Sequence, residues 1–197
     1  MNVRLFLAIE PSEGVRREAG RAVEHITNAL PALRARTTEP SALHLTLVFL
    51  GAVPEAEVPA LEGAAAGVAR TARPFTCASG GLGAFPSTRR PSVLWLGLEP
   101  ADPLAGLQRD LERALGAFHH RDDGKRFVAH LTLARVTGWD ATTRDTLADA
   151  LASFRPANAP WKVGAVVLYR SELGPSGARY TPLARLPLSA PAAGGTG

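Results

Sequence analysis

The chain has 197 residues, 46% hydrophobic and 20% charged, which is typical of a soluble globular protein with one large domain or two small lobes. The net charge of +4 and the sequence pI of about 10.0 favour a partner that bears phosphate, while the single cysteine, Cys77, excludes an internal disulfide and a cysteine-based zinc site. No apolar run could span a bilayer and the start MNVRLFLAIE makes a poor signal peptide, so we expect a cytoplasmic protein that does not associate with membranes.

The hydrophobic pattern predicts strands and helices that alternate along the chain. Strands are expected at 3–9, 43–50, 92–98, 126–136, 161–170 and 180–188, with a weaker one near 74–79. Helices are expected at 13–30 and 55–70, from Asp102 as N-cap with Pro103 in the first turn, and from about Asp140. The apolar stripe of the third helix contains Leu104, Leu107, Leu111, Leu115 and Phe118.

This order of elements predicts an α+β fold of two pseudo-symmetric lobes. Each lobe is expected to hold an antiparallel sheet with helices packed outside, and the two lobes are expected to face each other across a central cleft. We interpret residues 1–189 as a single two-lobed domain and residues 190–197, which have little to pack, as a disordered tail.

The sequence HLTL occurs twice, at 44–47 and at 130–133, once in each half of the chain. Strand alternation puts His44 and Thr46 on one face, roughly 6.5–7 Å apart, and does the same for His130 and Thr132. It also puts Phe49 with the leucines on the apolar face. A lone histidine in an apolar strand is more often a half-buried, hydrogen-bonded residue than a catalyst. Since two of the five histidines share this context, we predict one site in the cleft that contains both pairs.

These residue types favour chemistry at a phosphoester. A neutral histidine accepts the proton of an attacking water, and a protonated one gives a proton to the leaving oxygen. Threonine hydroxyls donate hydrogen bonds to the non-bridging oxygens. A two-histidine metal site normally needs a nearby carboxylate or a further histidine. Neither HLTL sequence has an acidic neighbour at strand spacing, so no metal or other cofactor is expected.

With its flanks, the duplicated HxTx motif resembles the RNA 2′,3′-cyclic phosphodiesterases, long called 2′-5′ RNA ligases, of the two-histidine phosphoesterase superfamily. The similarity extends over VRLFLAIE, ALHLTLVFLG, GAFPSTRRPSVLWLGL, RFVAHLTLAR and VVLYRSELGPSGARYTPLARLPL. It implies metal-independent hydrolysis of RNA 2′,3′-cyclic phosphate ends to 2′-phosphomonoesters. By resemblance, His44 is the proton donor, His130 is the proton acceptor, and Thr46 and Thr132 bind the phosphate.

The resemblance also implies that Arg135, five residues after the second histidine, helps to bind the phosphate. Strict alternation directs Arg135 away from His130, so this contact requires the strand to end or bulge near Ala134. Before the second histidine the family usually has proline, whereas this chain has Ala129.

Other residues receive simpler interpretations. His119 and His120 are expected at a solvated helix end, and His25 is expected to be an incidental residue of a surface helix. Trp95 and Phe127 are expected in the core. The loop arginines Arg89 and Arg90 are interpreted equally well as solvated charges or as contacts to RNA phosphates.

Three alternatives to hydrolysis of RNA ends remain open. They are reversible 2′-5′ RNA ligation, hydrolysis of a different cyclic nucleotide, and a non-catalytic module that binds RNA ends. The expected partner is RNA with a 2′,3′-cyclic phosphate end, and the chain is expected to be a monomer.

Overall fold

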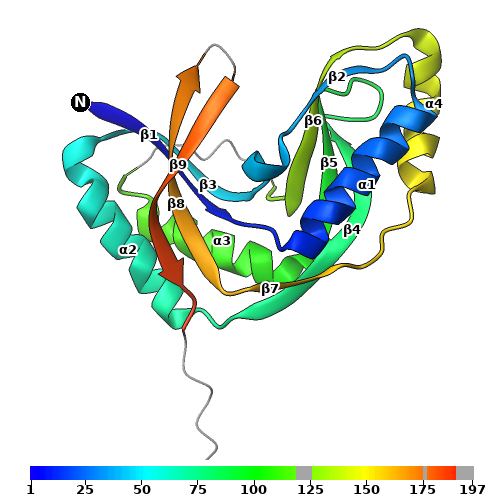
Figure 1. Cartoon of the computed structure of the whole chain (residues 1–197). Helices are drawn as coiled ribbons and strands as arrows, with labels where there is room; N and C mark the ends of the chain where they lie inside the picture. The colour runs from blue at the N-terminus through cyan, green and yellow to red at the C-terminus, as the bar shows by residue number, and fades with distance from the viewer. Residues whose placement is uncertain (119–125, 175–176, 190–197) are drawn as a thin grey trace, which may run out of the picture.

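The computed structural model describes residues 1–118, 126–174 and 177–189 and contains two antiparallel sheets (Figure 1). Sheet A has the strand order β3 (Leu45–Pro54), β1 (Asn2–Ile9), β8 (Ala165–Gly174) and β9 (Gly177–Pro187). Sheet B has the order β2 (Arg34–Thr37), β6 (His130–Gly138), β5 (Val93–Glu99), β4 (Phe75–Phe85) and β7 (Pro160–Val163).

Each sheet packs against a pair of helices. The helices α2 (Val58–Thr71) and α3 (Ala101–Leu115) contact each other and the strands of sheet A. The helices α1 (Glu13–Ala29) and α4 (Ala141–Ser153) do the same for sheet B. We call these two units lobe A and lobe B. The predicted α+β fold of two lobes is therefore confirmed.

The two sheets do not coincide with the two halves of the chain. Sheet A combines β1 and β3 from the start with β8 and β9 from the end, and sheet B combines β2 and β4 with β5, β6 and β7. One connected apolar core, which includes Leu7, Leu45, Leu96 and Leu131, extends through both lobes.

Local sequence explains where two of the helices begin. The Ser12 side chain accepts a hydrogen bond from the Val15 amide (3.3 Å) at the start of α1, and Asp140 accepts one from the Thr143 amide (2.7 Å) at the start of α4. The predicted N-cap at Asp102 is wrong, because the N-cap of α3 is Pro100, two residues earlier, and Asp102 lies in the first turn of the helix. No described helix is long and apolar enough to cross a membrane.

Three strand predictions need correction. The predicted strand 161–170 is two strands, β7 and β8, which are separated by Gly164 and belong to different sheets. The sequence did not predict β2, whose four residues are all exposed. The two motif strands begin later than expected, at Leu45 and at His130. The predicted tail falls in 190–197, outside the described residues.

Candidate active site

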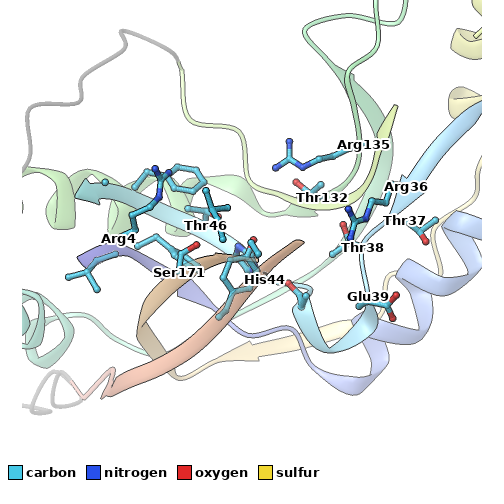
Figure 2. Close-up of a pocket in the computed structure, with 18 residues that line it drawn as sticks. Arg4, Arg36, Thr37, Thr38, Glu39, His44, Thr46, Thr132, Arg135 and Ser171 are labelled. Carbon is cyan, nitrogen blue, oxygen red and sulfur yellow. Dashed lines mark hydrogen bonds between the residues drawn. The ribbon is translucent and has the colours of Figure 1, made fainter. Parts of the chain in front are cut away.

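The two lobes line an open cavity of about 560 Å³. Sheet A contributes His44 and Thr46, which lie on either side of the first residue of β3, and sheet B contributes Thr132 and Arg135 from β6. Figure 2 shows the two groups on opposite sides of the cavity. Four of the five predicted site residues therefore line one cavity.

His130 lies beside this cavity and is not among the residues that line it. It is half-buried, two residues before Thr132 on β6. Its charge contributes to lowering the pKa of His44, so the two imidazoles are close enough to interact electrostatically.

Both histidine rings are held by the same hydrogen bond. His44 Nδ1 lies 2.7 Å from the carbonyl oxygen of Ala42, and His130 Nδ1 lies 2.7 Å from that of Val128. Because a carbonyl oxygen only accepts, each Nδ1 has the proton, and Nε2 is the nitrogen that gains or loses one. In each case the acceptor belongs to the residue two positions before the histidine.

The backbone before His44 is fixed by a contact between the lobes. Ala42 ends the short 3-10 helix η1 (Pro40–Ala42). The guanidinium of Arg16, on α1, donates a hydrogen bond to the carbonyl of Pro40. The element that orients the His44 ring is therefore anchored to lobe B.

Burial lowers the pKa of both histidines below the ordinary value. For His44 the largest cause is desolvation of the imidazolium, which outweighs the opposing hydrogen bond to Ala42, and the charge of His130 lowers the pKa further. For His130 desolvation again outweighs the hydrogen bond to Val128 and lowers the pKa. The free site therefore favours neutral imidazoles.

A β-bulge interrupts both motif strands at the same place. On β3, Val48 pairs with Leu7 and Thr46 with Ala8, which leaves Leu47 as the extra residue. On β6, Ala134 pairs with Leu94 and Thr132 with Trp95, which leaves Leu133 as the extra residue. Each bulge follows the threonine of its HLTL sequence and changes the side-chain alternation of the rest of the strand.

The bulges decide where Phe49 and Arg135 point. After the bulge, Arg135 lies on the cavity side together with Thr132 (Figure 2). The predicted contact of Arg135 with the phosphate required such a bulge near Ala134. The contact itself stays a prediction. Phe49 is 58% exposed and also lines the cavity. The expectation that it shares the apolar face with the leucines of 43–47 is wrong, because the shift at Leu47 turns it over.

Aromatic rings surround both histidines. The ring centroids of Phe6 and Tyr180 lie 4.9 and 5.0 Å from that of His44. Those of Phe85 and Trp95 lie 4.9 and 6.1 Å from that of His130. These rings exclude water from one side of each imidazole, which accounts for the desolvation that lowers both pKa values.

Trp95 corrects a sequence prediction. It was expected in the core, but it is half-buried and lies on the face of β5 that meets His130. It fits there because its partner on β4 is a glycine: a Cβ on Gly83 would lie 2.1 Å from the indole carbon Cζ2. Phe127 is partly buried against the core, as expected.

The remaining candidates lie outside the site. His25 connects α1 to α4, where its Nε2 lies 2.8 Å from the Ala150 carbonyl oxygen. Arg89 and Arg90 are exposed and are absent from the described lining of the cavity. His119 and His120 fall outside the described residues. Within the described ranges no group of three or more His, Cys, Asp or Glu side chains is arranged to hold a metal ion.

Arg4, Phe49 and Tyr180 are among the cavity residues that sequence reasoning missed. Arg4 had a usable signal, because alternation along residues 3–9 places it with Phe6, opposite Leu5 and Leu7. Phe49 had none, because nothing in residues 43–50 marks the bulge. Tyr180 reaches His44 only through the sheet pairing of β8 with β9, which the sequence did not predict.

Comparison with known proteins agrees with this geometry. The family model of the 2′-5′ RNA ligase superfamily matches residues 11–175. A curated RNA 2′,3′-cyclic phosphodiesterase of Methanothermobacter thermautotrophicus is 34% identical over 182 residues, which are 92% of this chain and 96% of the relative. One from Thermus thermophilus is 33% identical over 202 residues, with coverages of 94% and 90%.

Solved structures give the same result for the fold. A crystal structure of a Thermus thermophilus protein has a TM-score of 0.75 and 30% identity, and the match covers 94% of this chain and 97% of that one. Escherichia coli LigT complexed with 3′-AMP has a TM-score of 0.74 and 26% identity, with coverages of 95% and 99%. The resemblance found in the motifs and their flanks is confirmed: the chain belongs to the 2′-5′ RNA ligase superfamily.

Proposed function

We propose that this protein hydrolyses the 2′,3′-cyclic phosphate at the end of an RNA to a 2′-phosphomonoester, with a histidine pair and no metal. The names of the curated relatives, which match over most of their length, support the substrate. Two threonines and an arginine in one cavity with His44 support the reaction type.

In this mechanism His130 Nε2 takes a proton from a water molecule, whose oxygen attacks the phosphorus. The bond between phosphorus and ribose O3′ breaks, and His44 Nε2 gives its proton to O3′. The products are a 3′-hydroxyl and a 2′-phosphate. His130 ends with one proton more and His44 with one fewer, and exchange with solvent restores both.

Negative charge grows on the non-bridging phosphoryl oxygens during the reaction. The hydroxyls of Thr46 and Thr132 have no hydrogen bond to any described residue and are free to donate to these oxygens. The Arg135 guanidinium supplies a full positive charge and a two-pronged donor. Since both threonines lie two residues after a histidine, the donors and the proton-transfer groups approach the same phosphorus.

The observation that most strongly supports the proposal is the matched pair of hydrogen bonds at His44 and His130. The two Nδ1 atoms have equivalent partners at 2.7 Å, the carbonyl oxygens two residues before each histidine, and this gives both rings the same tautomer. Nε2 is then the nitrogen that exchanges a proton on each histidine, as paired acid–base catalysis requires.

The direct test uses a short RNA that ends in a 2′,3′-cyclic phosphate, incubated with the purified protein in EDTA. Wild type should form only the 2′-phosphate, identified by its position on the ribose. His44→Ala and His130→Ala should each nearly abolish turnover. Thr46→Ala and Thr132→Ala should be slower by roughly tenfold to a thousandfold, as for loss of one transition-state donor.

The alternatives give different outcomes in the same assay. Joined products in the presence of a 5′-hydroxyl acceptor would mean that the chain also ligates. If the RNA binds and is not hydrolysed, the protein is a non-catalytic module that binds RNA ends. Near-normal turnover by either histidine variant would refute the assigned roles, and activity that disappears with EDTA would refute the metal-free mechanism.

A further inference from the structure

Arg4 lies at the end of the cavity that belongs to sheet A (Figure 2). On β1 the side chains of Leu5 and Leu7 are buried in the core, so Arg4 and Phe6 project from the other face. The Phe6 ring lies 4.9 Å from the His44 ring. Arg4 precedes Phe6 by two residues on the strand, so their Cα atoms are roughly 7 Å apart.

Arg4 has no hydrogen bond and no ion pair with any described residue. The other fully charged side chains in the described lining are Arg36, Glu39 and Arg135, which come from β2, from the segment before η1 and from β6. On the sheet A side of the described lining, Arg4 is therefore the one permanent charge. Its neighbours there, which are aromatic, aliphatic or hydroxyl side chains, do not neutralise it.

The proposed function fixes where the substrate's ribose lies. His44 protonates the ribose O3′ when the cyclic phosphate opens, so the ribose must lie beside His44 and therefore over sheet A. The next group on the 5′ side of that ribose is the phosphate that joins it to the preceding nucleotide. Arg4 lies on this side of the cavity, on β1, which adjoins β3.

We propose that Arg4 binds this second phosphate and makes the enzyme prefer RNA ends to cyclic mononucleotides. This inference rests on the proposed function and adds a subsite to it. A guanidinium is suited to the role because it donates two parallel hydrogen bonds to a phosphodiester. Arg135 and the threonines bind the reacting phosphate, and Arg4 binds the one before it.

Three substrates distinguish the effect of the second phosphate on kcat/KM from the effect of the second nucleoside. They are adenosine 2′,3′-cyclic phosphate, the same compound with a 5′-phosphate, and an adenosine dinucleotide with a 2′,3′-cyclic phosphate end. For wild type, kcat/KM should be about tenfold or more higher for the last two, through a lower KM, because both have the phosphate at the 5′ oxygen.

Arg4→Gln should remove this preference. The last two substrates should lose about tenfold in kcat/KM, mostly in KM, while hydrolysis of adenosine 2′,3′-cyclic phosphate should stay unchanged. Arg4→Lys, which keeps the charge, should retain part of the preference. Arg109→Gln is the matched control, because Arg109 is exposed on α3 and is absent from the cavity lining.

Several results would overturn the inference while leaving the proposed function intact. One is equal kcat/KM of the wild type for all three substrates. Another is a preference for the dinucleotide alone that survives in Arg4→Gln, which would assign it to the second nucleoside. An equal loss on all three substrates would place the effect at the reaction centre. Failure of wild type on every substrate would instead overturn the proposed function, and this inference with it.

Discussion

Phe49 and Arg135 occupy equivalent positions in the two motif strands. Each is five residues after its histidine and two residues after a bulged leucine, and each lines the cavity. One is an aromatic ring on sheet A and the other a cation on sheet B. The duplicated HLTL sequences thus build two walls of similar backbone geometry and different chemistry.

Arg135→Ala should lower kcat/KM for a cyclic phosphate end by roughly a hundredfold to a thousandfold, because the transition state loses a charged donor. Arg135→Lys should recover only part of this, since a lysine cannot donate the two-pronged hydrogen bond. Steady-state kinetics with the RNA substrate are the measurement. A lysine variant as active as wild type would show that only the charge matters at this position.

Phe49→Ala should raise KM by about tenfold with little effect on the chemical step, because an exposed ring offers a base a stacking surface of roughly 1–3 kcal/mol. Phe49→Tyr should keep wild-type KM. The free energy of unfolding should change little, because 58% of Phe49 is exposed. If the alanine variant were instead destabilised by several kcal/mol with an unchanged KM, Phe49 would be a packing residue.

The pH dependence of kcat/KM should be bell-shaped, with its maximum below pH 6.5. In the free enzyme the pKa values of His44 and His130 are both lowered from 6.5 by burial. The active form has one proton on the pair and therefore predominates between the two lowered values. Activity falls at higher pH as the histidine pair loses its last proton and at lower pH as the pair gains a second one.

The profile of kcat should lie at higher pH than that of kcat/KM. A bound phosphodiester anion favours the imidazolium and raises the pKa values of the pair. Both profiles come from initial rates measured across the acid to weakly alkaline range. A kcat/KM maximum well above pH 7 would contradict the burial effect inferred for the free enzyme.

Gly83→Ala should destabilise the protein by about 1–3 kcal/mol and reduce kcat, because the new Cβ would overlap the Trp95 indole. The indole packs near the His130 ring, so its displacement disturbs the proton acceptor. Gly81→Ala is the control, since a Cβ there meets nothing within 4 Å. Urea unfolding and kcat of both variants are the measurements, and equal effects at the two glycines would refute the Trp95 explanation.

The sequence predicted the residues of the site better than the paths of the strands. Two identical HLTL sequences in apolar surroundings are a strong local signal, and the helix starts at Ser12 and Asp140 follow from capping chemistry. The strand β2, with four exposed residues, has no such signal. It exists because β6 offers an edge to pair with. Side-chain pattern alone does not encode such an edge.

The errors at Phe49 and Trp95 have related causes. Alternation assigns faces correctly only in an unbroken ladder, and a bulge at Leu47 reverses the assignment after it. Trp95 is apolar enough for the core, but the space beside Gly83 allows its ring to lie against His130. Both depend on pairing with distant strands, which one sequence does not reveal.

The order in which the chain visits the two lobes also governs how it can fold. The sheet that contains the first motif has only β1 and β3 until the last quarter of the chain supplies β8 and β9, and two strands alone are marginally stable in water. The chain passes back and forth between the lobes, so dividing it at any one position would not give two segments that each contain a complete lobe. Equilibrium unfolding should therefore be one cooperative transition, and these crossings tether the two histidines at a fixed separation before any substrate arrives.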